Sequence, residues 1–410
     1  MKKIVVVGGG ASGLLAAGQA ALAGAEVLLL EKMKKPANKI LISGKGRCNI
    51  TNASDVHAHL SHFNRSGRFL HQAYTCFFVP QLMEFFAENG LKLVTERGNR
   101  VFPASGRSQD VVQALLRWLN RTGAKIECTK AVTALGVENN RVTGVFCGSR
   151  FIAADAVVLA TGGTSYPATG STGDGHRIAE DAGHSIVPLR PALVPLVVKN
   201  HLPSLAGLDL RNTAVRVFVN GKRKKSDFGE VSFTRSGIGG PVILTLSKFI
   251  IEQLDKNRHV SILLDLKPAL DDRKLDARLQ RDFSSRHKEE LQSVLRGLLP
   301  QQLIPLCLAQ TGLGGSEAVG TISARARAVL RNWLKNTSFE VDGYRPVAEA
   351  IVTAGGIRVT EVNPNTMESL KVNGLYLTGE LLDIDADTGG YNLQAAFSTG
   401  WLAGRSAASS

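Results

Sequence analysis

The chain has 410 residues, of which 44% are hydrophobic and 20% are charged, and its formal net charge is +14. This composition excludes an intrinsically disordered or fibrous protein and predicts two or three globular domains. Five scattered cysteines without CxxC or CxxH spacing exclude a disulfide framework and a structural zinc site, and they indicate a reducing compartment.

The chain begins with the elements of a dinucleotide-binding unit. The β-branched run at residues 4–7 predicts a buried parallel strand, and the Ala/Leu-rich stretch 14–23 predicts a helix that Gly24 ends. A second buried strand is predicted at 27–30. Strand, glycine-rich turn, helix and strand in this order are typical of a Rossmann unit.

Three glycines between the first strand and the helix have the spacing G-x-G-x-x-G. Gly8 permits the tight turn, Gly10 lets the backbone approach a pyrophosphate, and Gly13 lets the helix pack closely on the strand. The phosphates are then expected at the N-terminus of the helix, where unpaired N–H groups favour anions. Glu31 lies where an acid accepts bonds from ribose hydroxyls, which favours FAD or NAD over NADP.

The N-terminal segment also imitates a secretory signal. Cleavage after Ala23 or Ala25 would, however, destroy the strand–turn–helix–strand unit that explains all of its residues. No other apolar stretch of about 18 residues is present, so the sequence predicts no membrane span and a cytoplasmic location.

Two further glycine-rich turns follow. LISGKGRCNITN at 41–52 is not a P-loop, because no Ser or Thr follows the lysine in the required place. The glycine pair Gly162–Gly163 ends the strand predicted at 156–160, and the carboxyl end of a parallel strand is where open α/β sheets bind ligands.

The C-terminal segment again has a predicted strand that is followed by glycines. A strand is predicted at 375–378, followed by Gly379–Glu380, a loop, and Gly389–Gly390 at the start of a helix from Tyr391. No second G-x-G-x-x-G follows a strand, so no dedicated NAD(P)H domain is evident.

The middle of the chain differs in character. TAVRVFVNGKRKK at 213–225 predicts a hairpin with an Asn220–Gly221 turn and a basic arm, VSILLDL predicts a strand, and 268–335 has a helical pattern. The prediction is a split Rossmann-like FAD-binding domain of α/β class, with an inserted β-rich, barrel-like domain and a helical subdomain. The predicted boundaries are 1–188 and 348–410 for the FAD domain, 189–266 and 336–347 for the β-rich domain, and 267–335 for the helices.

Five segments resemble the HI0933-like (BaiN/RdsA) family of FAD-dependent oxidoreductases: 5–17, 39–53, 100–112, 155–184 and 350–404. The resemblance implies that the turn at 43–49 folds against the flavin, that Glu380 and Asp383 lie near its ribityl chain, and that the helix from Tyr391 points its N-terminus at the flavin, where the positive end of its dipole stabilises negative charge. It further implies that the backbone of Val132 lies near the adenine. Arg235 stands where family members commonly have histidine.

The candidate cofactor contacts are Gly8, Gly10, Ala11, Ser12, Gly13, Glu31, Lys32, Lys39, Gly44, Gly46, Arg47, Val132, Thr161, Gly162, Gly163, Gly379, Glu380, Asp383, Gly390, Asn392 and Leu393. The candidate catalytic residues are Arg47, Cys48, Asn49 and Tyr391. Cys48 has two interpretations, a redox thiol or a small buried packing residue, and the second is favoured because no partner cysteine is near. The histidines His57, His59 and His62 are interpreted as a solvated loop and not as a metal site.

The substrate stays open at this stage. The positive charge favours a polyanion such as RNA, or serves only solubility. The leading hypothesis rests on this charge and on what the family resemblance implies: reduction of a uracil in ribosomal RNA to dihydrouridine, with NAD(P)H as a transient reductant. The alternatives are a small molecule (reduction of a conjugated enone or oxidation of an amino-ketone) and a flavin-bearing RNA-binding protein without turnover. The oligomeric state is not predicted.

Overall fold

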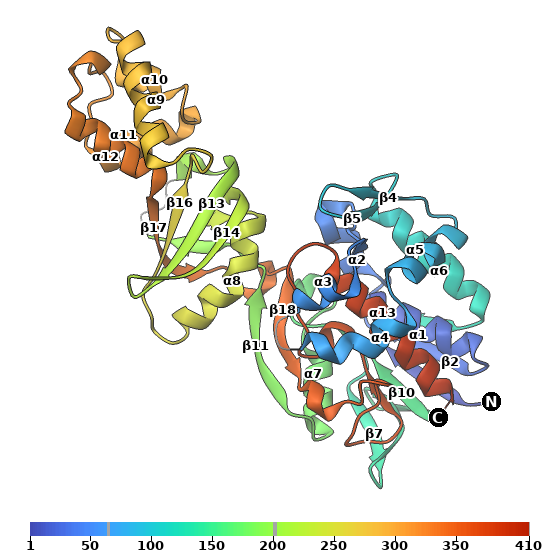
Figure 1. Ribbon diagram of the computed structural model, residues 1–410. Helices are drawn as coiled ribbons and strands as arrows, with labels where there is room; N and C mark the ends of the chain where they lie inside the picture. Colours follow the sequence, from blue (N-terminus) through green and yellow to red (C-terminus); the bar gives the residue numbers. More distant parts are fainter. Residues whose placement is uncertain (64–65, 200–202, 410) are drawn as a thin grey trace. The chain divides into compact units, whose positions relative to one another are not determined.

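The computed structural model describes residues 1–63, 66–199 and 203–409. The chain forms two compact units, one made of Met1–Ala192 with Pro346–Ser410 and the other of Leu193–Arg345. The smaller unit is inserted between β11 (Ile186–Ala192) and β18 (Val352–Ile357), which pair antiparallel within the larger unit (Figure 1). The finer division predicted from the sequence stays a prediction.

The larger unit is built on a five-stranded parallel sheet with the order β19-β10-β1-β2-β6. Its strands are β1 (Lys3–Val7), β2 (Glu26–Glu31), β6 (Lys125–Cys128), β10 (Ala156–Leu159) and β19 (Leu375–Leu377). The apolar runs of β1 and β10 are buried on both faces, as expected for central strands of a parallel sheet. Helices α1 (Ala11–Leu22), α6 (Ser108–Thr122) and α13 (Tyr391–Ser409) pack together in one core with the sheet.

Smaller elements complete this unit. Two three-stranded sheets have the orders β3-β5-β4 and β7-β8-β9. Their strands are β3 (Thr51–Asn52), β4 (Leu93–Glu96), β5 (Arg100–Pro103), β7 (Ala134–Glu138), β8 (Arg141–Cys147) and β9 (Arg150–Ala153). The remaining helices are α2 (Asn38–Ile42), α3 (Val56–Ser61), α4 (His71–Cys76), α5 (Val79–Glu88) and α7 (Asp174–Asp181).

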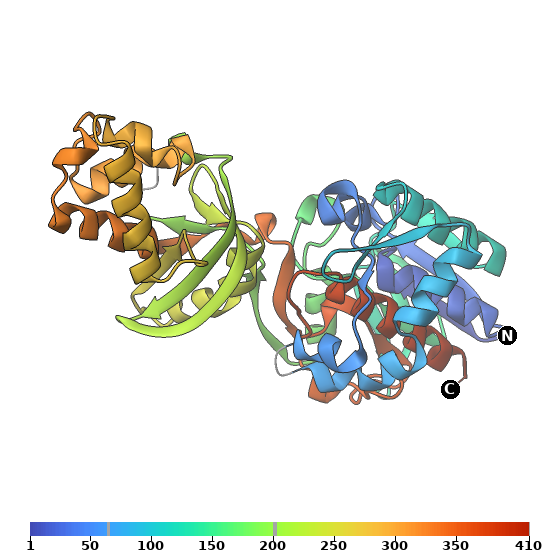
Figure 2. The same ribbon diagram turned by 45° about the horizontal axis from the view of Figure 1, so that its top comes forward.

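The smaller unit is a closed antiparallel barrel with the strand order β12-β15-β14-β13-β16-β17. Its strands are β12 (Leu196–Val198), β13 (Asp209–Val219), β14 (Lys222–Phe233), β15 (Gly237–Gly239), β16 (Val260–Asp265) and β17 (Thr337–Tyr344). Its helices are α8 (Pro241–Leu254), α9 (Asp272–Ser285), α10 (Leu291–Leu295), α11 (Ile304–Thr311) and α12 (Ala324–Lys335). Figure 2 shows α9 to α12 gathered at one end of the barrel, and one cluster of buried residues runs through both.

The structure confirms the predicted fold class, a Rossmann-type domain with an inserted barrel and helices. Asn220 and Gly221 both have positive φ, as the predicted hairpin turn requires. Gly24 has φ +91° directly after α1, which ends where the sequence indicated. Within the described residues, none of the helices combines the length and apolar character needed to cross a bilayer.

Candidate flavin-binding site

The glycine turn after β1 leaves room for a ligand at one of its three predicted glycines. A Cβ on Gly13 would lie 1.9 Å from the carbonyl oxygen of Gly8, and a Cβ on Gly8 would lie 2.6 Å from that of Ala160. A Cβ on Gly10, by contrast, would meet no atom within 4 Å. Gly8 and Gly13 are therefore required by the packing of the protein itself, whereas Gly10 borders open space of the kind that a pyrophosphate needs.

The N-terminus of α1 opens onto the same space. Its first intrahelical hydrogen bond runs from the N–H of Leu14 to the oxygen of Gly10, at 3.0 Å. The N–H groups of Ala11, Ser12 and Gly13 precede this bond, so the helix offers them no carbonyl acceptor one turn earlier. Such a terminus favours an anion, because free N–H groups and the helix dipole act together.

Glu31 holds the turn in shape from the end of β2. Its two carboxylate oxygens accept the N–H groups of Gly9 and Met33, each at 2.7 Å, and the residue is 8% exposed. Each oxygen keeps a further lone pair, so the expected ribose contact is compatible with these bonds. The neighbouring Lys32 is paired with Asp174 at 2.6 Å.

The end of β10 lies against this turn. Gly162 has φ +73°, and a Cβ on Gly163 would lie 2.4 Å from the hydroxyl of Thr353. The hydroxyl of Thr161 is buried without a hydrogen-bond partner. An unsatisfied buried hydroxyl beside an open cradle is what a missing polar ligand would explain.

Val132, whose backbone the family resemblance places near the adenine, lies close to the end of β2. It precedes β7 in an irregular segment and is buried. The same segment is tied to the end of β2, since the N–H of Lys130 donates to the oxygen of Glu31 at 2.9 Å. This places the backbone near Val132 close to Glu31.

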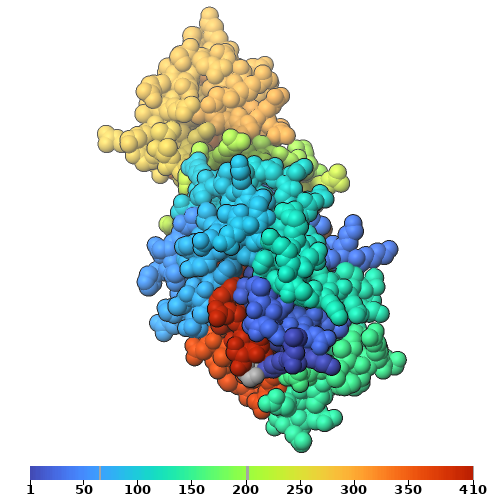
Figure 3. All heavy atoms as spheres, turned by 90° about the vertical axis from the view of Figure 1, so that its right-hand side faces the viewer, coloured from blue at the N-terminus to red at the C-terminus, as the bar shows by residue number. Residues whose placement is uncertain are grey.

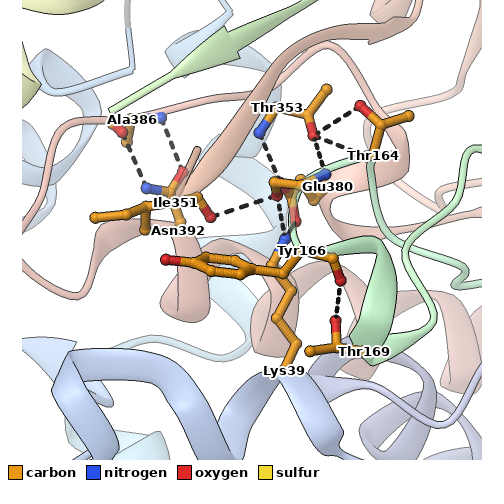
Figure 4. A network of polar contacts seen from close by, with 10 residues as sticks. Lys39, Thr164, Tyr166, Thr169, Ile351, Thr353, Glu380, Ala386 and Asn392 are labelled. Atoms are coloured by element: carbon orange, nitrogen blue, oxygen red, sulfur yellow. Dashed lines mark hydrogen bonds and ion pairs between the residues drawn. The ribbon is translucent and has the colours of Figure 1, made fainter. Parts of the chain in front are cut away.

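Glu380 is the centre of a polar network that joins distant segments (Figure 4). Its carboxylate lies 2.5 Å from the ammonium of Lys39 and accepts the N–H of Thr353 at 2.8 Å and the hydroxyl of Ser165 at 3.1 Å. Lys39 also donates to Ser165, at 2.6 Å. Lys39 and Glu380, both predicted site residues, are thus direct partners although 341 positions separate them.

Ser165 and Thr353 were not singled out from the sequence. Both fall inside segments that carried the family resemblance, but a Ser or Thr in a turn or strand gives no individual signal. Thr353 belongs to β18 and accepts the N–H groups of Thr164 and Ser165, at 2.8 and 3.0 Å. It therefore fixes the turn after β10 relative to Glu380.

The N-terminus of α13 forms a second anion-favouring end. Gly389 and Gly390 have φ of +137° and +103°, and a Cβ on Gly390 would lie 2.5 Å from the backbone of Thr51. The first intrahelical bond runs from Gln394 to Gly390, at 3.1 Å. The side chain of Asn392 is bonded to both the N–H and the oxygen of Ala386, each at 2.9 Å (Figure 4). A cofactor contact by Asn392 would therefore use its backbone N–H group.

Helices α1 and α13 pack closely, with the first turns of α1 against the middle of α13. A Cβ on Gly400 would lie 2.2 Å from the oxygen of Ser12, and one on Gly404 would lie 2.2 Å from that of Ala16. A Cβ on Gly379 would lie 2.7 Å from the hydroxyl of Ser12. Figure 3 shows α13, in red, beside the N-terminal segments, in dark blue. Residues from both ends of the sequence thus form one site.

Tyr391 lies among aromatic rings at the start of α13. Its ring stacks on that of His62 with centroids 4.0 Å apart, and it meets the ring of His59 edge-on at 4.9 Å. His62 is paired through Nδ1 with Asp387 at 2.9 Å. Burial raises the pKa of the Tyr391 hydroxyl, so this group stays protonated at neutral pH.

The interpretation of the histidines as a solvated loop is wrong for His59. It lies in α3, is fully buried and has Nε2 2.7 Å from the oxygen of Asn52. Burial lowers its pKa, so the ring is neutral. Among the described residues, no group of His, Cys, Asp and Glu side chains is arranged to hold a metal ion.

The turn at 43–49 has an unusual backbone, with positive φ at Gly44, Lys45, Gly46 and Cys48. The guanidinium of Arg47 pairs with Glu96 and lies 4.2 Å above the ring of Phe102. The amide oxygen of Asn49 is buried without a partner, which leaves it available to a ligand.

The structure favours packing over redox chemistry for Cys48. Its side chain is fully buried, and burial raises its pKa to about 11. A thiol with this pKa is protonated at neutral pH, whereas the thiolate is the reactive form. Burial therefore supports the interpretation of Cys48 as a small packing residue.

These observations fit a bound dinucleotide: a cradle at Gly10, the anion-favouring N-termini of α1 and α13, an acid after β2 and an unsatisfied hydroxyl at Thr161. Fold and site together define a Rossmann-type flavoprotein. The chain belongs to the HI0933-like family, since the model described as the HI0933-like protein Rossmann domain matches residues 2–406. It is an FAD-dependent oxidoreductase.

Two relatives are similar over nearly the whole chain. A 3-dehydro-bile acid delta(4,6)-reductase of Clostridium scindens is 34% identical over 100% of this chain and 99% of its own length. A ribosomal RNA dihydrouridine synthase of Haemophilus influenzae is 30% identical over 97% of this chain and 96% of its own length. In fold, the chain resembles 3-ketosteroid delta1-dehydrogenase from Sterolibacterium denitrificans, with a TM-score of 0.54 and 16% identity over the whole of both chains.

Proposed function

We propose that this protein reduces a uracil in ribosomal RNA to dihydrouridine, with NAD(P)H as the reductant of its FAD. The observation that carries the proposal is the whole-length similarity to a ribosomal RNA dihydrouridine synthase in a chain with a net charge of +14. A polyanionic substrate is attracted by such a charge, and the attraction steers its association. The proposed substrate implies a cytoplasmic protein.

The reaction adds one hydride and one proton across a carbon–carbon double bond conjugated to a carbonyl group. In uracil the hydride goes to C6 and the proton to C5, and NAD(P)H is oxidised to NAD(P)⁺ in the same cycle. FAD, when bound, supplies the hydride transfer. The protein must hold the flavin and the uracil in register, exclude water and provide a proton.

Tyr391 is the proposed proton donor, because it stays protonated and is held by the stacked ring of His62. His62 and its partner Asp387 then act as positioning residues for the tyrosine. Arg47 and Asn49 are proposed to contact cofactor or substrate, since Asn49 has an unsatisfied amide oxygen. The cofactor contacts proposed from the sequence keep their roles, with Asn392 acting through its backbone.

NAD(P)H is proposed to visit the site only transiently. The sequence has the G-x-G-x-x-G motif after a strand only at Gly8–Gly13, so no second motif of this kind indicates a separate NAD(P)H-binding domain.

Purified protein with bound FAD tests the proposal directly. Anaerobic NADH should bleach the flavin, and unmodified ribosomal RNA transcribed in vitro should restore its colour while the RNA gains two mass units at a uridine. A strain lacking the gene should lose the same dihydrouridine from its ribosomal RNA. Bleached flavin that RNA cannot re-oxidise, together with an unchanged modification map, would refute the RNA substrate.

A small-molecule enone is the second candidate, favoured by the 34% identity to the bile-acid reductase. Both relatives' names describe the reduction of a carbon–carbon double bond, so the two candidates share one chemistry. Re-oxidation of the bleached flavin by a 3-oxo-4,6-diene steroid, and not by RNA, would select this candidate. Binding of RNA without any re-oxidation would select an RNA-binding flavoprotein.

A further inference from the structure

The smaller unit carries most of the excess positive charge. Residues 193–345 contain 24 Lys and Arg against 15 Asp and Glu. In its helical part many cations are neutralised by neighbouring acids. Ion pairs join Arg286 to Glu289, Arg327 to Asp276, Arg331 to Asp272 and Asp276, and Lys335 to Asp265.

The hairpin of β13 and β14 is different. Residues 222–225 are four consecutive cations, Lys222, Arg223, Lys224 and Lys225, and all four are exposed. Within the described part of the chain none of them forms an ion pair. The ammonium group of Lys225 makes a cation–π contact with Phe249, 5.3 Å from the centroid of the ring. We call residues 222–228 with their partner strand the basic hairpin.

The outer face of the basic hairpin combines charge with an aromatic ring. Directly opposite residues of an antiparallel pair share a face. Arg223 is opposite Phe218 and Phe228 is opposite Ala214, so these residues lie on the face away from the buried Val215 and Val217. Lys225 and Lys222 are opposite Val217 and Val219, so they lie on the other face of the hairpin, although both are exposed. Phe228 is 57% exposed, which is unusual for an aromatic side chain.

One edge of β14 is also unpaired. Its pairing with β15 is limited to Ser232 and Phe233, so the stretch from Lys222 to Glu230 has a strand partner only in β13. Lysines on an edge strand commonly serve only to prevent aggregation. An exposed phenylalanine on the same strand works against that purpose, so protection does not explain the whole surface.

We propose that the basic hairpin is the surface that docks single-stranded or unpaired RNA, with residues 222–225 at phosphates and Phe228 stacked on a base. The chemistry matches RNA on three counts: unneutralised cations for phosphates, an exposed ring for a base, and free backbone groups along an edge. A small apolar substrate would need none of them. The inference rests on the proposed function, since it names the part of the chain that would recognise the RNA.

The test compares two quadruple variants with the same loss of charge. One changes Lys222, Arg223, Lys224 and Lys225 to Gln, and the other changes four exposed cations of the helical part without ion pairs to Gln: Arg273, Arg281, Lys288 and Arg296. The probe is unmodified ribosomal RNA transcribed in vitro, and binding is measured from 50 to 300 mM salt. Flavin content and the rate of flavin reduction by NADH report whether each variant is folded.

The hairpin variant should lower the slope of log Kd against log salt by about 2 to 3, because each lost phosphate contact in a single strand removes about 0.7. The control variant should lower it by less than about 1. Phe228→Ala should weaken binding by about 5- to 100-fold and leave the slope unchanged, since stacking releases no counterions.

The outcomes separate this inference from the proposed function. Wild-type protein that modifies the RNA, with a hairpin variant that binds no worse than the control, overturns the inference and leaves the function standing. Wild-type protein that neither binds nor modifies the RNA overturns both. A selective loss of binding in the hairpin variant, with normal flavin reduction, supports both.

Discussion

The placement of the cofactor can be tested with two alanine substitutions three residues apart. Gly13→Ala adds a methyl group 1.9 Å from the oxygen of Gly8, whereas Gly10→Ala adds one that meets no protein atom within 4 Å. The first change must displace the backbone, and overpacking of this kind costs about 1–3 kcal/mol or more of unfolding free energy. The second should leave the apoprotein unchanged within about 0.5 kcal/mol.

FAD binding, in contrast to the stability of the apoprotein, should be weakened by Gly10→Ala. If the pyrophosphate fills the space beside Gly10, the added methyl should weaken FAD binding at least about tenfold, or about 1.4 kcal/mol. Saturating FAD should then stabilise the wild-type protein by about 2.7 kcal/mol at 100 times its Kd, and the Gly10→Ala variant by clearly less.

Urea denaturation of apoprotein and holoprotein measures both effects. Trp118 and Trp401 report on the larger unit, and a Trp333→Phe background common to all variants removes the signal of the smaller unit. Titration of apoprotein with FAD gives Kd independently. A Gly10→Ala variant that binds FAD as tightly as the wild type would refute the inference that the open space beside Gly10 holds the pyrophosphate.

Four further changes probe the rest of the site. Glu380→Gln breaks the half-buried pair with Lys39, so it should lower the unfolding free energy by about 1–3 kcal/mol and weaken FAD binding. The control Asp181→Asn breaks an exposed pair with Arg177 and should lower the unfolding free energy by less than about 0.5 kcal/mol. Equal losses in the two variants would contradict a central role for Glu380. Tyr391→Phe should slow substrate reduction by about 10²- to 10⁴-fold with an unchanged rate of flavin reduction by NADH, and equal slowing of both half-reactions would exclude it as proton donor. Cys48→Ala should keep turnover, and the native thiol should react with alkylating reagents only slowly below its pKa of about 11; loss of turnover would restore the redox interpretation. Glu361 is partly desolvated, but its bonds to Ser185 and Lys371 lower its pKa to about 2, so the stability that it contributes is present above about pH 4.5 and is lost as the pH falls towards 2. Glu361→Gln should therefore lower the unfolding free energy by about 1–3 kcal/mol at pH 7. Chemical denaturation at several pH values should show that this difference shrinks below about pH 4.

The parallel sheet and the two helix starts could be predicted because their signals are local. Glycine spacing, β-branched runs and the Asn220–Gly221 turn each act over a few residues. The pairing of Lys39 with Glu380 could not be predicted, because it depends on how segments 341 positions apart are brought together. His59 was misinterpreted for a related reason: three histidines in six residues indicate a polar loop, but the ring is buried by Tyr74, Phe78 and Tyr391, which come from other elements.

The net charge of the chain can be read from the sequence, but which cations are paired with acids depends on the fold. A net charge of +14 says only that a polyanion is favoured, and counting along the sequence cannot distinguish paired from unpaired cations. Ion pairing makes the distinction: many cations of the helical part are paired with acids, whereas none of residues 222–225 forms an ion pair within the described part of the chain. The Rossmann unit carries the features that fit FAD, and those features are independent of the substrate. If relatives that reduce a steroid acid and a ribosomal RNA use the same flavin chemistry, the choice between such substrates must lie in residues outside the cofactor cradle. The basic hairpin is the part of this chain whose chemistry discriminates between them, so its neutralisation should remove RNA reduction while the flavin remains fully reducible by NADH.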